Sequence, residues 1–179
     1  MNKVMLKTER TELKFPLPFV TPEIIVEAIG DEETIAFMSA VPSMEYTEDN
    51  AKDFMAYLKY SENSDENLQL GVFDIRTNCF IGMCALENIN QEYSVCELGY
   101  WLNKSYVGKG YMTECVNAII QYAKDELQIK TINAFVITEH KRSIALLERV
   151  GFIKQELLEN DTDNKGKQVD RYWYKMHVV

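Results

Sequence analysis

The chain has 179 residues, of which 46% are hydrophobic, and its 28 acidic and 19 basic side chains give a formal charge of −9 at pH 7. This balance excludes a disordered or fibrous chain and predicts one folded domain over residues 1–179. The negative charge repels a phosphate backbone, so nucleic acid is a poor partner, whereas an amine-bearing partner suits the charge.

Membranes and metals are also poor matches to the sequence. No apolar run is long enough to cross a bilayer, and the first residues lack the apolar stretch and cleavage site of a signal peptide. The four cysteines form no C-x-x-C pair, and the chain has two histidines. We therefore expect a cytoplasmic protein with reduced cysteines, no metal site and no membrane partner.

The first half of the chain predicts a strand, two helices and a meander. Residues 11–17 alternate polar and apolar side chains until a proline, as an early strand does. Helices are predicted to begin at Thr21, which precedes a proline, and at Thr47, which precedes two acidic residues. Short apolar runs between turn residues then predict antiparallel strands near 70–73, 79–83 and 95–102.

The second half predicts two helices, each followed by strands. Apolar spacing indicates a helix over residues 111–127, a strand over 131–137 and a helix over 141–150 that ends at Gly151. Closing strands are expected near 152–158 and 171–178, on either side of the turn-rich residues 161–166.

Strand alternation divides residues 95–102 between two faces of the predicted sheet. One face carries Cys96, Leu98, Tyr100 and Leu102. The other carries Glu97, Gly99 and Trp101. The carboxylate of Glu97 is thus separated from the aliphatic set.

A glycine-bearing loop joins this strand directly to the next predicted helix. Gly108 and Gly110 let the backbone approach a ligand closely, and the free N–H groups and dipole of a first helical turn stabilise an anion. A lone G-x-G is otherwise an ordinary turn. The loop lacks both the ending of a Walker P-loop and the third glycine of a dinucleotide fingerprint, which disfavours nucleoside triphosphate and NAD. The segment predicts a diphosphate cradle.

Residues 97–114 resemble the acyl-CoA pyrophosphate loop of GNAT acetyltransferases, especially the group that acetylates ribosomal-protein amino termini. Residues 107–112 fill the superfamily pattern Gln/Arg-x-x-Gly-x-Gly/Ala, with Val107 and Met112 departing at its outer positions. Residues 143–152 are similar to the family stretch Asn-x-x-Ser-x-x-x-x-Glu-Lys-x-Gly-Phe. The segments 8–10 and 169–172 extend the resemblance over nearly the whole chain.

The resemblance implies an α/β fold of the α+β type, with a mixed, mostly antiparallel central sheet flanked by helices. It implies acetyl transfer from acetyl-CoA to an amine, with a protein N-terminal α-amine as the favoured acceptor. The residues it implies as coenzyme A contacts are Tyr100, Leu102, Val107, Gly108, Lys109, Gly110, Tyr111, Met112, Thr113 and His140. His140 stands where the family usually has a pantetheine-binding asparagine, and Leu147 where many members have a general-acid tyrosine.

The expected mechanism is direct attack of a neutral amine on the thioester, with a backbone N–H of residues 97–102 meeting the oxyanion. Glu97 is the candidate base and Ser143, which matches a serine of the ribosomal-protein group, the candidate acid. Each also has a structural interpretation, since Glu97 could be an exposed strand residue, Ser143 a helix-start hydroxyl and His140 a solvated loop residue.

Two other functions stay open. The chain could acetylate small amines such as polyamines or aminoglycosides, which the acidic balance suits, or it could be a non-catalytic acyl-CoA-binding module, which Leu147 and His140 leave possible. The expected partners are acetyl-CoA and an amine acceptor, with a ribosomal protein amino terminus as one candidate, and the assembly is a monomer or a homodimer.

Overall fold

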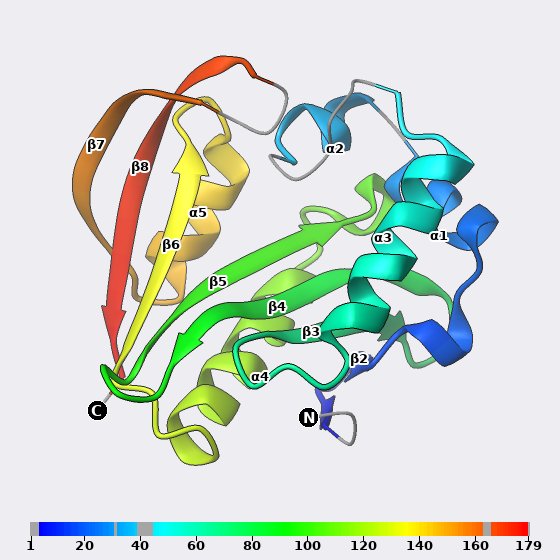
Figure 1. The fold of residues 1–179 in the computed structure, drawn as a ribbon, viewed down its shortest axis with the longest axis horizontal. Helices are drawn as coiled ribbons and strands as arrows, with labels where there is room; N and C mark the ends of the chain where they lie inside the picture. The colour runs from blue at the N-terminus through cyan, green and yellow to red at the C-terminus, as the bar shows by residue number, and fades with distance from the viewer. Residues whose placement is uncertain (1–3, 31, 39–44, 163–165, 179) are drawn as a thin grey trace.

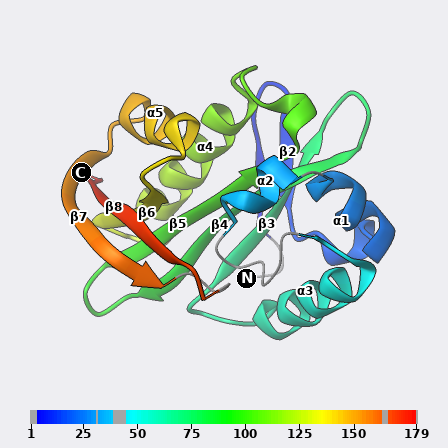
Figure 2. The same ribbon diagram turned by 90° about the horizontal axis from the view of Figure 1, so that it is seen from above.

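A computed structural model of the chain describes residues 4–30, 32–38, 45–162 and 166–178. Within these ranges eight strands form one sheet in the order β1-β2-β3-β4-β5-β6-β8-β7 (Figure 1). Neighbouring strands are antiparallel, except that β5 and β6 run parallel. Helices cover both faces, with α4 and α5 on one side and α1 and α3 on the other (Figure 2). The predicted mixed, mostly antiparallel sheet flanked by helices is confirmed.

The amino-terminal third forms short strands and the helices of one face. Its elements are β1 (Met5–Lys7), β2 (Thr11–Lys14), a 3-10 turn (Leu17–Phe19), α1 (Pro22–Ile29), α2 (Glu32–Ala36) and α3 (Glu48–Ser61). Thr21 and Thr47 cap α1 and α3 as predicted, because each side chain accepts a hydrogen bond from the third helical N–H. The sequence did not predict β1 or α2.

The remaining elements follow the predicted order. They are β3 (Leu68–Asp74), β4 (Phe80–Asn90), β5 (Val95–Leu102), a 3-10 turn (Lys104–Tyr106), α4 (Tyr111–Asp125), β6 (Thr131–Ile137), α5 (Lys141–Arg149), β7 (Ile153–Thr162) and β8 (Gln168–His177). The predicted turn at 161–166 is corrected in part, because Asp161 and Thr162 lie within β7. Residues 163–165 lie outside the described residues.

The hydrophobic core is divided by the sheet. One cluster packs beneath α4 and α5 and includes Val72, Cys84, Leu86, Cys96, Leu98, Cys115 and Ile119. The other packs beneath α1 and α3 and includes Ile25, Ile29, Leu58, Phe73 and Met83, with Trp101 against it. The predicted alternation along β5 is therefore confirmed, since Leu98 and Trp101 join opposite clusters.

The sheet opens between its two parallel strands. The β5–β6 register covers only Val95 to Glu97 against Thr131 to Asn133. Beyond these pairs β5 continues along β4 and β6 continues along β8, so the two strands diverge (Figure 1). Beyond these three pairs, β5 and β6 are not paired with each other. Among the described residues, no helix combines the length and apolar character needed to span a membrane.

Candidate active site

A cavity of about 980 Å³ occupies the opening between β5 and β6. Its lining comes from α1, α2 and α3 on one face of the sheet and from α4 and α5 on the other. A volume of this size is at the upper end of the range for small-molecule sites. The cavity therefore has two ends. We call the end lined by the glycine loop, α4 and α5 the α4 end, and the end lined by α3 and the facing residues of β3 and β4 the α3 end.

The α4 end is built on the glycine loop. Gly108 and Gly110 have φ angles of +77° and +84°, which side chains rarely adopt. Gly110 is the N-cap of α4 and has no side chain with which to cap it. The first helical turn therefore lacks a side-chain cap, and Gly110, Met112 and Thr113 line the cavity. An anion in the cavity can accept hydrogen bonds from the N–H groups of this first turn.

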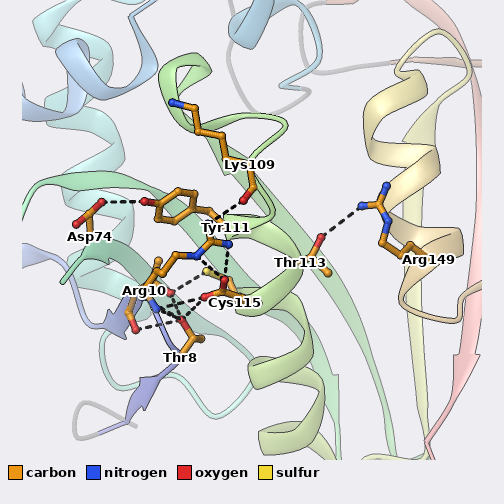
Figure 3. Close-up of polar contacts among 10 residues, drawn as sticks. Thr8, Arg10, Asp74, Lys109, Tyr111, Thr113, Cys115 and Arg149 are labelled. Atoms are coloured by element: carbon orange, nitrogen blue, oxygen red, sulfur yellow. Dashed lines mark hydrogen bonds and ion pairs between the residues drawn. The ribbon is translucent and has the colours of Figure 1, made fainter. Parts of the chain in front are cut away.

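Arg10, from the turn between β1 and β2, holds this loop from behind (Figure 3). Its Nη1 donates to the carbonyl oxygen of Lys109 at 2.9 Å, and its Nε donates to Glu114 Oε1 at 2.6 Å. The guanidinium also lies over the ring of Tyr111, with Cζ 4.3 Å from the ring centroid. One side chain thus fixes the residues before, at and after the start of α4.

Two carboxylates complete this support. Glu114 Oε2 accepts a hydrogen bond from the Thr8 hydroxyl at 2.9 Å, and Asp74 Oδ2 accepts one from the Tyr111 hydroxyl at 3.2 Å. Burial opposes ionisation of Glu114, but the hydrogen bonds and charge of Arg10 outweigh it and lower the pKa. For Asp74, burial is likewise outweighed, by hydrogen bonds from two backbone N–H groups and from Tyr111, so its pKa is also lowered. Both supports are ionised at neutral pH.

Basic side chains gather near the same end. Arg149 lines the cavity and donates to the Thr113 hydroxyl at 3.5 Å, and Lys104 and Arg142 also line it. Lys109 differs, because its Nζ donates to the Ser105 carbonyl at 2.7 Å and the residue is not part of the lining. The cavity therefore meets a basic rim where the loop and α5 approach each other.

Ser143 and Tyr100 face each other at the wall between β5 and α5. Their hydroxyl oxygens lie 2.7 Å apart, and both residues line the cavity. Burial raises the pKa of Tyr100 despite its hydrogen bond to Ser143, so the phenol stays protonated. The pair can pass a proton towards the cavity. Leu147, one turn along α5, is buried and offers no proton.

His140 lies at the start of α5 and contacts the residue that follows α2. Its ring stacks on Phe37 with 4.2 Å between centroids and 6° between planes. Burial lowers the pKa of His140, so the ring is neutral at pH 7. Arg142 on α5 forms an ion pair with Glu33 on α2. These two contacts hold α2 across the mouth of the cavity.

The α3 end is acidic and hydroxyl-rich. Its polar lining includes Tyr46, Asn50, Asp53, Tyr57, Gln69 and Glu87. Burial, and then the charge of Asp53, raises the pKa of Tyr46 to about 12. Side chains of this kind favour a cationic group over an anionic one. The two ends of the cavity are thus opposite in charge.

The structure brings most of the sequence-predicted site residues to this cavity. Ser143 and the expected coenzyme A contacts line it, apart from Lys109. Glu97 is not in the lining formed by the described residues, although Gly99, two residues along the same strand face, is. Arg10, Glu114 and the α3-end cluster were missed as site residues. Only the family-like opening at residues 8–10 gave a signal for Arg10.

Comparisons with known proteins all match this chain to N-acetyltransferases. The acetyltransferase (GNAT) domain family matches residues 21–153. The uncharacterized N-acetyltransferase p20 of Bacillus licheniformis is 27% identical over 96% of this chain and 94% of that protein. The [ribosomal protein uS5]-alanine N-acetyltransferase of Escherichia coli (strain K12) is 35% identical, over 48% of this chain and 44% of that protein.

Solved structures share the fold over nearly the full chain. The microcin C7 self immunity acetyltransferase MccE, crystallised with acetyl-CoA and AMP, superposes with a TM-score of 0.80 and 22% identity over 96% of this chain and 94% of that one. At this identity the likeness is one of fold.

Proposed function

The chain belongs to the acetyltransferase (GNAT) domain family as an acetyl-CoA-dependent N-acetyltransferase, and from this premise we propose that it acetylates the α-amine of a protein amino terminus. The sequence resemblance and the named activity of the Escherichia coli relative, which acts on a ribosomal protein, support this acceptor. The observation that carries the proposal is the cavity between β5 and β6, which connects a basic, amide-lined end to an acidic end.

The donor is proposed to bind at the α4 end, where the diphosphate meets the first-turn N–H groups of α4 after Gly110. Arg149 and Lys104 add positive charge near it. Acetyl-CoA supplies an activated thioester that an amine can attack without a covalent enzyme intermediate. Backbone N–H groups on β5 beyond Glu97, where the pairing with β6 has ended, are proposed to stabilise the charge that develops on the carbonyl oxygen.

One proton has to leave the protonated amine before attack, and one has to reach the sulfur of the departing thiolate. Ser143, supported by the protonated Tyr100 hydroxyl, is proposed to protonate the departing thiolate. The amine enters from the α3 end, where a carboxylate takes its proton before attack. Glu97, the base expected from the sequence, and Glu87 occupy directly paired positions of β5 and β4 on that face.

The direct test uses isotopically labelled acetyl-CoA and mass spectrometry of the products. Peptides that copy ribosomal-protein amino termini are expected to gain one label on the α-amine, and matched peptides with a blocked α-amine and a free lysine are expected to gain none. Release of free thiol, followed with a thiol reagent, measures turnover in the same samples. Labelling of the lysine alone would contradict the α-amine proposal.

A second acceptor class is favoured by one observation. Asp53 and Glu87 together make the α3 end acidic, as a polyamine site would be. Spermidine and an aminoglycoside are therefore included in the acceptor panel. A kcat/KM for either that exceeds the value for every peptide would replace the protein amino terminus with that class of small amine as the acceptor.

A further inference from the structure

Glu87 lies on β4, on the face of the sheet that packs against α3. It is paired in register with Glu97 of β5, so the two carboxylates belong to neighbouring strands on one face. Glu97 is at the last residue pair that joins β5 to β6, before the strands diverge. Glu87 lines the cavity and Glu97 does not belong to the lining formed by the described residues.

The Glu87 carboxylate is held through one oxygen by neutral donors. Oε1 accepts a hydrogen bond from Gln69 Nε2 at 2.8 Å and one from the Tyr57 hydroxyl at 3.5 Å. Gln69 Nε2 also donates to the Tyr57 hydroxyl oxygen at 3.1 Å, so the three side chains form a closed set. Burial, and then the charge of Glu87, raises the pKa of Tyr57, which keeps its proton available for the hydrogen bond. All three residues line the cavity.

The other carboxylate oxygen faces a position without a side chain. A Cβ placed on Gly99 would lie 3.6 Å from Glu87 Oε2, and Glu87 is the sole residue with atoms within 4 Å of it among those compared. Gly99 also lines the cavity and has no positive φ, so its lack of a side chain serves space and not backbone conformation. Space for a ligand group therefore exists directly beside Oε2.

We infer that Oε2 of Glu87 binds the acceptor's ammonium group and removes its proton, as the catalytic base of the proposed acetyl transfer. Gln69 and Tyr57 are positioning residues, because they hold Oε1 and leave Oε2 directed at the amine. Neutral donors suit this role better than a lysine or arginine, since a buried ion pair would lower the basicity of the carboxylate. Glu97, at the closed part of the β5–β6 pair, lacks this access.

The proton balance of the step is complete. A protonated amine carries two protons that leave nitrogen during amide formation. The first passes to Glu87 Oε2 and gives the neutral amine, which forms the C–N bond as the C–S bond breaks. The second reaches the sulfur through Ser143, so free coenzyme A leaves as the thiol. Glu87 then returns its proton to solvent through the acidic end of the cavity, and no other reactant is required.

The paired positions provide a matched experiment. Glu87→Gln and Glu97→Gln each remove one carboxylate from the same face, and a glutamine at 87 can still accept the hydrogen bond from Gln69. Turnover of a peptide acceptor with a free α-amine is measured by thiol release across a pH series. At pH 7 only about one-tenth of an α-amine is neutral, so Glu87→Gln is expected to lower kcat/KM about tenfold, whereas Glu97→Gln changes it less than about threefold.

The pH profile separates a base from a merely structural residue. Without its base, the enzyme uses only the acceptor fraction that is already neutral, and an α-amine has a pKa of about 7.7–8.0. The deficit of Glu87→Gln is therefore expected to shrink as pH rises above this value, with the affinity for acetyl-CoA unchanged. A constant deficit at every pH, or a larger effect of Glu97→Gln, would overturn the inference.

Gly99→Val gives an independent readout. The added side chain fills the space beside Oε2 and is expected to raise the KM of the acceptor about tenfold or more, without changing acetyl-CoA affinity by calorimetry. An unchanged acceptor KM in this folded variant would contradict the assignment. The proposed function fails separately, because in that case the parent enzyme itself releases no thiol with any amine in the panel.

Discussion

The two ends of the cavity are built in different ways. At the α4 end the ligand-facing groups are mainly backbone amides of consecutive residues, and Arg10 fixes them from behind. At the α3 end they are side chains drawn mainly from α3, β3 and β4, with Tyr57, Gln69 and Glu87 in one hydrogen-bonded set. A backbone site needs glycines at fixed places, whereas a side-chain site needs only that distant segments fold together. Substitutions can therefore change the acceptor that the side-chain site binds while the backbone site still binds the same donor.

The largest effect is expected from Gly110→Val, which disrupts the backbone site at the α4 end. The residue has φ +84°, which a valine rarely adopts, and an added Cβ would lie 3.1 Å from Arg10 Nη2, so the loop backbone is strained and the guanidinium has to shift. Loss of two amide contacts to a phosphate costs ~3–4 kcal/mol, or a few hundredfold in affinity. Calorimetry with acetyl-CoA is expected to show this loss.

Gly166→Val is the matched control for Gly110→Val. Gly166 also has a positive φ, of +73°, but no atom of those compared lies within 4 Å of an added Cβ, and it is absent from the cavity lining of the described residues. It carries the backbone strain alone and is expected to keep its affinity. Equal affinities for Gly110→Val and the parent would place the diphosphate elsewhere.

Ser143→Ala tests whether the proton for the thiolate comes from the Ser143 hydroxyl, which lies beside Tyr100 between β5 and α5. We expect kcat to fall about 100-fold, the lower range for loss of a general acid. Acetyl-CoA affinity should stay unchanged, because the backbone cradle is intact. Steady-state kinetics with saturating acetyl-CoA measure the effect. Ser105→Ala is the control, since Ser105 is exposed and outside the lining of the described residues. A normal kcat in Ser143→Ala would make Ser143 a structural hydroxyl.

Arg10→Ala tests whether the support behind the loop is specific to the donor. Its hydrogen bond to the Lys109 carbonyl joins a charged donor to the backbone, and such bonds contribute ~1.5 kcal/mol or more. We expect the KM for acetyl-CoA to rise about tenfold while the acceptor KM stays the same. Arg10→Lys should recover only part of this, because an ammonium lacks the planar fork.

Lys52→Ala is the control for Arg10→Ala, since it removes an exposed ion pair with Asp49, and neither residue belongs to the cavity lining of the described residues. Its kinetic constants should match those of the parent. Equal increases of both substrate KM values in Arg10→Ala would mean that Arg10 supports the whole fold and not the α4 end.

The smallest expected effect concerns His140, whose ring stacks on Phe37 next to α2. Burial lowers the pKa of His140 from its usual 6.5, so the folded protein resists protonation there. Its stabilising contribution is present above about pH 6.5 and is lost as pH falls below it. Between about pH 7.5 and 5.5 the Tm of the parent should fall about 2 °C further than that of His140→Asn. Parallel Tm curves in differential scanning fluorimetry would show that this histidine carries no such linkage.

Local signals explain what the sequence could predict. The threonine caps at positions 21 and 47, the alternation along β5 and the glycines of the loop are all determined within a few residues of chain, and each is observed. The resemblance to GNAT acetyltransferases, which rests on the glycine loop and on residues 143–152, is confirmed by the family match. The family and the glycine loop at the start of α4 were therefore accessible from sequence.

Longer-range contacts explain the rest. Helix α2 spans five residues and β1 three, too short for a period to appear. Asp161 looked like a turn residue, but Arg171 Nε donates to its Oδ2 at 2.6 Å across the β7–β8 pair, and this ion pair extends the strand. Glu87 depends on partners 18 and 30 residues away in sequence. No spacing rule joins residues that meet only through the fold.

The divergence of β5 from β6 has a kinetic consequence. If donor and acceptor approach from opposite faces, neither product obstructs the exit of the other. Only the reactive tip of a polypeptide has to reach the gap, and its remaining length stays in bulk water. Initial-rate plots at varied concentrations of both reactants should then give intersecting lines, the pattern of a ternary complex. The two substrates need not bind, and the two products need not leave, in a fixed order.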